Sequence, residues 1–322
     1  MNIFVIGCGS IGRRHIKNLI SLGYSPIGID PFQEYREYVE KEFKVKTYED
    51  IDIAMQKMVP DIALICTPPS SHVELGKKLA LKKVHLFIEK PVSNKLDEID
   101  ELKEIAKKNN VKTMVGYNWR FSRSLKRVKE VLDSGILGKM IYAKILFGQY
   151  LPDWRPWQDY RKSYSAIKEM GGGIILDASH EIDYANWLFG KLELISSACG
   201  KLSNLEINVE DTVEMLLKND KGALVNIHLD FVRRDKKRYC EIVCESGTIY
   251  CDLLEGTIRI YDCNKKNWKE EKINEMIDEM YVEEIKYFID CCLNKMENNI
   301  STIDEAKHVL KIALKAREMC EV

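Results

Sequence analysis

Three short motifs in this chain carry residue types that could do chemistry, and the first is a glycine turn near the N-terminus. An apolar stretch at residues 2–6 runs directly into this turn. A buried strand, a glycine turn and a helix that opens at about Ile11 place unpaired backbone N–H groups where they can bind a dinucleotide pyrophosphate. The predicted cofactor-binding residues of the turn are Gly7, Gly9, Ser10, Ile11 and Gly12.

A carboxylate stands at the end of the next apolar segment. Asp30 lies 18 residues after Gly12, where a dinucleotide fingerprint has the acid that accepts from the adenosine ribose 2′-hydroxyl. Its charge would repel the 2′-phosphate of NADP, so NAD is the expected cofactor. Arg36 is close enough in sequence to moderate that repulsion, which keeps NADP possible.

The second motif, Glu89-Lys90-Pro91, follows an apolar run at residues 84–88. An acid and an amine at the mouth of a parallel sheet, held by a proline, are hard to explain by core packing. Pro91 favours an extended backbone at Lys90. We therefore predict a functional role for Lys90, and we place Glu89 and Lys90 beside the cofactor.

Polar residues also follow two other predicted strands. Thr67 and Pro68 come after residues 61–66, and His72 falls in the first turn of the next helix, which we favour over a catalytic role. All three are expected on the cofactor side. Asn118 and Arg120 follow residues 112–116 and could face the nicotinamide or substrate, or could equally stabilise the junction between domains.

The third motif is a triple glycine at residues 171–173, followed by Asp177 and His180. On a 3.6-residue period these two share one helix face with Glu181 and Tyr184. An acid one turn before a histidine can orient the imidazole and stabilise its protonated form. We predict that Asp177 and His180 are catalytic and contact the substrate.

Aromatic and basic residues precede that motif. The aromatic side chains offer apolar faces for a sugar ring, and the guanidinium groups of Arg155 and Arg161 suit a phosphate or carboxylate. Packing against a sheet would explain any single aromatic residue equally well. With Arg120, the predicted substrate-binding residues of this part are Trp154, Trp157, Tyr160 and Tyr164.

The pattern of apolar segments predicts two domains of different class. Residues 1–120 alternate strand-like runs with amphipathic helices near 11–22, 70–83 and 95–109, which indicates a doubly wound parallel Rossmann sheet. Beyond residue 139, strand-like runs follow one another on short turns and predict a large open, mostly antiparallel sheet flanked by helices. The expected strands are 2–6, 26–30, 61–66, 84–88, 112–116, 139–149, 192–200, 211–218, 223–232, 238–245, 248–253 and 256–261. The other expected helices are 121–135, 176–189, 275–296 and 302–319.

We therefore expect an NAD(P)-binding domain at 1–120 and an α+β domain for substrate binding and oligomerisation at 121–300. A C-terminal helix within 301–322 could pack back on the first domain. The open sheet of the second domain predicts a homodimer or homotetramer.

Composition limits the function classes. With 49 basic and 50 acidic residues the net charge is −1, which gives no reason to expect a nucleic-acid or membrane partner. The ten cysteines include no CxxC pair, so neither a metal site nor a disulfide framework is expected, and free thiols indicate a reducing compartment. The first strand begins at once and no apolar run is long enough to span a membrane, so a cytoplasmic protein is expected.

The glycine turn, Glu89-Lys90-Pro91 and the triple glycine with Asp177 and His180 together resemble the glucose–fructose oxidoreductase and inositol dehydrogenase family, Gfo/Idh/MocA, over nearly the whole chain. Within that family, residues 154–164 and 179–184 resemble a branch that is found with bacterial surface-sugar biosynthesis. The resemblance implies an NAD(P)-dependent oxidoreductase acting on sugars, nucleotide sugars or cyclitols. It places Lys90 and His180 on the family's catalytic lysine and histidine and Asp177 on the accompanying acid, and it suggests a cis or strained Lys90–Pro91 bond. The acid and histidine are often four residues apart in the family but three apart here. The resemblance therefore supports the assignment of His180 more strongly than that of Asp177.

Chemistry divides the proton work between the two catalytic residues. Imidazole starts near a pKa of about 6.5 and lysine near about 10.4, so His180 is the expected acid or base. Lys90 would stabilise negative charge on the reacting oxygen. Two alternatives stay open at this point: an inactive NAD(P)-binding sensor or regulatory protein of the same fold, and a reductase of a linear carbonyl or imine.

Overall fold

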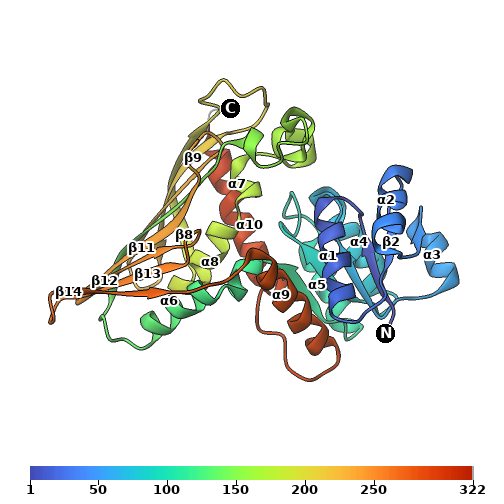
Figure 1. The fold of residues 1–322 in the computed structure, drawn as a ribbon, viewed down its shortest axis with the longest axis horizontal. Coiled ribbons are helices and arrows are strands. Elements are labelled where there is room, and N and C mark those ends of the chain that lie inside the picture. Colours follow the sequence, from blue (N-terminus) through green and yellow to red (C-terminus); the bar gives the residue numbers. More distant parts are fainter. Residues whose placement is uncertain (321–322) are drawn as a thin grey trace. The chain divides into compact units, whose positions relative to one another are not determined.

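A computed structural model describes residues 1–320 and divides them into two compact units (Figure 1). Unit 1 contains Met1–Asn118 and Ile277–Lys307, and unit 2 contains Trp119–Met276 and the residues from His308 onward. Residues 321 and 322 of the expected C-terminal helix lie outside the described residues.

This division differs from the expected one in two segments. Residues 277–300, expected in the second domain, group with unit 1 because α9 (Ile277–Cys292) packs on α1 (Ser10–Ser21). The Arg14 guanidinium lies 4.5 Å from the centre of the Tyr281 ring in that contact. The last helix, α10 (Ile303–Glu318), begins in unit 1 and continues in unit 2.

The sheet of unit 1 is parallel throughout, with the strand order β3-β2-β1-β4-β5-β6. Its central strands are buried on both faces, which is why they read as continuous apolar runs. The predicted Rossmann fold is confirmed. Its elements are β1 (Ile3–Ile6), β2 (Ile27–Ile29), α2 (Gln33–Phe43), β3 (Thr47–Tyr48), α3 (Ile51–Lys57), β4 (Ile62–Ile65), α4 (His72–Ala80), β5 (His85–Glu89), α5 (Ile99–Lys108) and β6 (Thr113–Gly116), with α1 and α9.

The sheet of unit 2 has eight strands in the order β14-β13-β12-β11-β7-β10-β9-β8. It is mostly antiparallel, as predicted, but β7 and β10 pair in parallel. Alternate residues of its strands are buried, which is the pattern of a sheet covered on one face. Its elements are α6 (Arg123–Asp133), β7 (Met140–Gly148), α7 (Ile174–Asp177), α8 (His180–Phe189), β8 (Leu192–Gly200), β9 (Thr212–Asn219), β10 (Leu224–Asp230), β11 (Lys237–Cys244), β12 (Gly247–Asp252), β13 (Thr257–Asp262) and β14 (Asn267–Lys272).

One cysteine pair corrects the expectation of free thiols. Cys199 on β8 and Cys320, just after α10, are joined as a disulfide with their Cα atoms 5.1 Å apart. The two are 121 residues apart in sequence, so no local spacing could reveal the pair. The other cysteines are free thiols.

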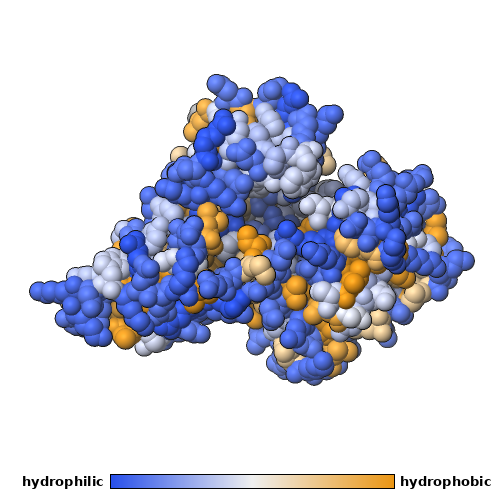
Figure 2. Space-filling model, in the orientation of Figure 1, coloured by the Kyte–Doolittle hydropathy of each residue, from blue (hydrophilic) through white to orange (hydrophobic). Residues whose placement is uncertain are grey.

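Within residues 1–320, no helix combines the length and the apolar character that crossing a membrane requires. Hydrophilic side chains cover most of the visible surface, and hydrophobic residues are scattered among them (Figure 2).

Candidate functional site

The glycine turn of unit 1 is tight because backbone atoms approach where side chains would stand. Gly7 has a φ of +95°, and a Cβ there would lie 2.6 Å from the Cys66 carbonyl oxygen. A Cβ on Gly12 would overlap the Gly7 carbonyl oxygen, whereas one on Gly9 would meet open space. Two glycines therefore permit the strand-to-helix turn, and the third leaves the backbone open to a ligand.

The first turn of α1 is free to receive an anion. Gly9 is its N-cap, no side chain caps the helix, and no acidic residue lies in the first turn. The first N–H groups of a helix have no partner within the helix and carry its positive dipole end. The exposed Ser10 and half-buried Ile11 begin this turn, so the arrangement fits the pyrophosphate of NAD.

Asp30 ends β2 beside that turn and is 5% exposed. One of its carboxylate oxygens accepts from the Cys8 N–H at 2.8 Å and the other from the Phe32 N–H at 2.9 Å. These bonds fix the carboxylate and leave lone pairs for a ribose hydroxyl. Arg36 donates to the main-chain carbonyls of Asp30 and Pro31 at 2.8 and 2.9 Å.

A buried histidine holds the carboxylate of Glu89. His15 Nε2 on α1 lies 2.6 Å from Glu89 Oε1, and the His15 side chain is fully buried. The other oxygen of Glu89 accepts from the Lys90 N–H at 3.1 Å. The ring of Tyr281 on α9 lies 6.0 Å from that of His15, where burial and then the Glu89 charge raise the pKa of its hydroxyl to about 12.

His72 ties two strand-end loops together rather than opening toward a ligand. Its Nδ1 lies 3.0 Å from the Pro91 carbonyl oxygen and its Nε2 lies 2.8 Å from that of Thr67. Carbonyl oxygens only accept, so a neutral ring can donate to one of them and a protonated ring to both. Burial lowers the pKa of His72, so one donated bond prevails at neutral pH.

Lys90 thus stands between two braced residues. Its peptide bond to Pro91 is cis, as the family resemblance suggested, and its side chain is half-buried. Asn118, at the end of unit 1, is 1% exposed, and its Oδ1 has no hydrogen-bond partner within the described residues. A buried acceptor of this kind is expected to receive a donor from a ligand. Thr67 is half-buried and Pro68 is exposed on the loop after β4.

In unit 2, the triple glycine is fixed by a brace that the sequence did not reveal. Arg317 on α10 donates to the Gly172 carbonyl oxygen and, at 2.8 Å, to the carboxylate of Glu210. The same carboxylate accepts from the Ile175 N–H at 3.2 Å. Gly173 has a φ of +105°, and a Cβ there would collide with Glu210.

That brace leads into the predicted catalytic residues. Asp177 ends α7, and His180 begins α8 with 9% of its surface exposed. The carboxylate of Asp177 accepts from the Tyr164 hydroxyl and, at 2.5 Å, from the Ser165 hydroxyl. Burial and then the Asp177 charge raise the pKa of Tyr164, so this tyrosine remains the donor. Tyr164 and Asp177 therefore lie together.

The expected single helix over 176–189 is broken at residues 178 and 179, and two acids on α8 pair with arginines. Asp183 accepts from Arg120 Nε and Nη2 at 2.9 and 2.7 Å, and neither side chain is more than 2% exposed. Glu181 accepts from Arg238 Nε at 2.6 Å. Both residues of the Arg120–Asp183 pair belong to unit 2, and the predicted contact of Arg120 with the substrate stays a prediction.

The predicted aromatic residues are spread over the loop that follows β7. The Trp154 indole packs 5.7 Å from the Phe147 ring and 5.2 Å from the Phe231 ring. Tyr160 is half-buried, and its hydroxyl accepts from the Glu206 N–H at 3.2 Å. Trp157 is 80% exposed. Within residues 1–320, no group of three His, Cys, Asp or Glu side chains could hold a metal ion.

His15, Glu210 and Arg317 belong to the site's support, and sequence reasoning missed them. Each acts across a long sequence separation: 74 residues for His15 with Glu89, and 107 for Arg317 with Glu210. Only the Gly-Arg-Arg-His run that starts at Gly12 offered a local signal, because His15 falls one turn into the helix.

Two family models match the chain in sequence. A model of an oxidoreductase family with an NAD-binding Rossmann fold, GFO_IDH_MocA, covers residues 1–117, and a GFO/IDH/MocA C-terminal domain covers residues 125–250. The first match confirms NAD as the expected cofactor of the Rossmann domain.

Curated relatives and solved structures agree with that match. Myo-inositol 2-dehydrogenase of Thermotoga maritima is 30% identical over 306 residues, which are 90% of this chain and 87% of the relative. The NAD-dependent scyllo-inositol 2-dehydrogenase of Bacillus subtilis is 26% identical over 93% of this chain and 88% of its own. The fold is shared with a levoglucosan dehydrogenase in complex with NADH and levoglucosan, at a TM-score of 0.88 and 17% identity. The match covers 99% of this chain and 96% of the levoglucosan dehydrogenase. It is also shared with the WlbA dehydrogenase from Bordetella pertussis in complex with NADH and UDP-GlcNAcA, at a TM-score of 0.82 and 19% identity. That match covers 99% of this chain and 96% of the WlbA dehydrogenase.

Proposed function

This chain belongs to the Gfo/Idh/MocA family of NAD-binding oxidoreductases, and from that premise we propose that it transfers hydride between NAD and a secondary hydroxyl or carbonyl of a sugar, nucleotide sugar or cyclitol. Relatives that act on inositols and structural neighbours bound to sugars support this substrate range. The single observation that carries the proposal is Lys90, held at the end of β5 between a braced Glu89 and a braced Pro91.

The residues of unit 1 fit NAD by their geometry. The uncapped first turn of α1 would hold the pyrophosphate, Asp30 the ribose and Asn118 Oδ1 a donor of the nicotinamide carboxamide. Bound NAD supplies the acceptor or donor of hydride.

The side chains of the protein would handle the proton. His180 takes the proton from the hydroxyl during oxidation and returns it during reduction, because an imidazole titrates near neutral pH. Lys90 donates a hydrogen bond to the same oxygen and stabilises the negative charge that develops on it. Asp177 is a positioning residue, and its bonds to Tyr164 and Ser165 hold it in one orientation.

The test is turnover with NAD on a panel of inositols, sugars and nucleotide sugars, followed by absorbance of the reduced cofactor. We expect Lys90→Ala to lower kcat by about 100-fold or more while NAD still binds. His180→Ala should lose a similar factor. If both act on one oxygen, the double variant should lose less than the product of the single losses. Normal turnover in Lys90→Ala would refute the assignment.

We also propose that the chain forms a homodimer or homotetramer through the outer face of the unit 2 sheet. Tyr142 on β7 and Leu224 on β10 are partners in register, and they are 41% and 42% exposed on that face. Light scattering after size exclusion measures the mass directly. Tyr142→Glu should shift the mass to the monomer, and a monomeric wild type would refute the proposal.

A further inference from the structure

Loops that are far apart in sequence gather at one end of the central strands of the unit 2 sheet. Strands β7 and β10 are parallel neighbours, with Gly148 opposite Asp230, and β11 begins at Lys237 opposite the same Gly148. The segments after β7 and β10 therefore leave the sheet side by side. They also touch, because the Leu151 N–H donates to the Phe231 carbonyl oxygen at 2.9 Å.

The predicted acid or base lies near this same end of the central strands. Arg238, the second residue of β11, is opposite Phe147 in register and binds Glu181 at 2.6 Å. Glu181 follows His180 directly in the first turn of α8. His180 is therefore next in sequence to a residue that contacts the central strand β11.

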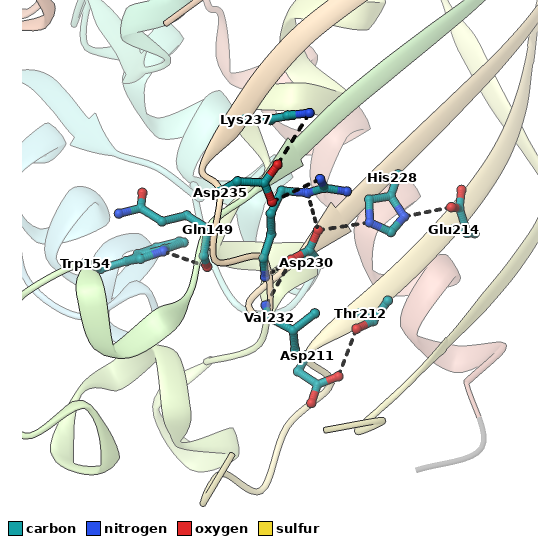
Figure 3. A network of polar contacts seen from close by, with 11 residues as sticks. Gln149, Trp154, Asp211, Thr212, Glu214, His228, Asp230, Val232, Asp235 and Lys237 are labelled. Carbon is teal, nitrogen blue, oxygen red and sulfur yellow. Dashed lines mark hydrogen bonds and ion pairs between the residues drawn. The ribbon is translucent and has the colours of Figure 1, made fainter. Parts of the chain in front are cut away.

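Several cations at this end of the strands already have acidic partners. Lys237 pairs with Asp235 (Figure 3). The Arg233 guanidinium lies 3.5 Å from both Asp230 and Asp235. Asp230 is further engaged by His228 at 3.0 Å. In the loop after β7, Arg161 Nε binds Asp159 at 2.9 Å.

Three other cations have no such partner. Within residues 1–320, no carboxylate lies within 4 Å of the charged groups of Arg155, Arg234 or Lys236. The Arg234 guanidinium lies 3.3 Å from the centre of the Tyr150 ring, close to where β7 ends. Partial burial and then the nearby Arg238 charge lower the pKa of Lys236.

Arg155 has the most specific position of the three. It lines a small hollow with Trp154, Tyr160 and Ser163. Its guanidinium lies 6.0 Å from the centre of the Tyr164 ring, and the Tyr164 hydroxyl donates to Asp177. A planar guanidinium can donate two parallel hydrogen bonds to one carboxylate or phosphate.

We propose that Arg155, with Arg234 and Lys236, forms an anion-binding subsite, and that the substrate carries an oxyanion, either a carboxylate or a phosphate. This inference rests on the proposed function, because it takes His180 as the acid or base of the reaction. It selects acidic sugars and nucleotide sugars over neutral cyclitols. Of the two arginines that the sequence offered for this role, the structure engages Arg161 with Asp159 and leaves Arg155 available.

The experiment compares Arg155→Gln with Arg161→Gln, a matched control in the same loop, on three substrates. Myo-inositol is neutral, D-glucuronate carries a carboxylate, and UDP-N-acetylglucosamine carries phosphates. We expect a higher kcat/KM on at least one anionic substrate than on myo-inositol. We expect Arg155→Gln to lower that value by about 10- to 100-fold, mainly through KM, and to change the myo-inositol value by less than about threefold.

The two anionic substrates identify the source of the oxyanion. A loss confined to D-glucuronate assigns the subsite to a carboxylate, and one confined to UDP-N-acetylglucosamine assigns it to phosphate. An equal loss on all three substrates, or an equal loss in Arg161→Gln, would overturn the subsite.

A separate measurement keeps this inference distinct from the proposed function. If the wild type turns over nothing on the panel, calorimetry with D-glucuronate and UDP-N-acetylglucosamine on the NADH-loaded protein still tests the subsite. Binding that Arg155→Gln abolishes and Arg161→Gln retains would support it. If neither D-glucuronate nor UDP-N-acetylglucosamine binds the wild type, the subsite is overturned.

Discussion

Replacing Asp183 with asparagine should destabilise unit 2 strongly and leave substrate recognition nearly intact. Its carboxylate makes two hydrogen bonds to Arg120, and both side chains are almost completely buried. The variant keeps the shape of the side chain but removes its charge, so the buried Arg120 cation loses the counter-charge that Asp183 supplies.

The magnitude follows from that burial. Breaking a buried ion pair by removing one partner costs about 3–5 kcal/mol. A domain of about 150–250 residues loses about 2–4 °C of Tm per kcal/mol, so we expect Tm to fall by about 6–20 °C. The double variant Arg120→Met with Asp183→Leu removes both charges and should recover much of this loss.

Calorimetry or circular dichroism during heating gives Tm, and initial rates at a temperature where the variant is folded give KM. If Arg120 instead bound the substrate, Asp183→Asn would change Tm by less than about 2 °C and raise KM. That result would refute the structural role of the buried Arg120–Asp183 pair. So would a double variant that loses as much stability as the two single variants combined.

Three further predictions concern the cofactor, Lys90 and pH. Asp30→Ala should narrow the NAD over NADP ratio of kcat/KM by about tenfold or more, and an unchanged ratio would remove Asp30 from cofactor selection. His15→Phe keeps a ring against Phe87 but loses the bond to Glu89, so kcat should fall by about 10- to 100-fold while the Kd of NAD, measured by calorimetry, changes little. His228→Gln should cost about 1 kcal/mol of unfolding free energy at pH 5.5 and little at pH 8.5. The hydrogen bond to Asp230 raises the pKa of His228. The stabilisation that His228 provides is therefore complete below about pH 6.5 and is lost as the pH rises through the folded pKa. Urea unfolding that showed equal losses of unfolding free energy at the two pH values would contradict this.

The Rossmann sheet could be predicted almost strand by strand. Its strands are buried on both faces and therefore appear as short apolar runs bounded by polar residues. By contrast, α2 buries only Val39, and β14 has no buried residue. Elements that contribute so little to a core leave no apolar pattern, and this is why both were missed.

The parallel pairing of β7 with β10 was also beyond the sequence. Short turns show that consecutive strands are antiparallel, but they say nothing of strands that are distant in the chain. This pairing brings the segments after residues 148 and 230 to the same end of the sheet, and the proposed anion-binding subsite of Arg155, Arg234 and Lys236 depends on it.

The sequence predicted a polar helix face after the triple glycine but could not identify the groups that its acids meet. The sequence shows acids at helical spacing, and it cannot show whether a ligand or another side chain meets them. Glu181 and Asp183 meet arginines 57 and 63 residues away. Buried charges are paired as a rule, so long-range arginines should be considered before a polar helix face is assigned to a substrate.

The last strand of the unit 2 sheet protects one edge of that sheet. An unpaired edge of an open sheet invites another strand to add to it, which leads to uncontrolled aggregation. Strand β14 occupies one such edge and presents Lys269, Glu270, Glu271 and Lys272 in succession. Strand addition would force these charges against those of a second copy, so growth of the sheet by a further strand at β14 is discouraged.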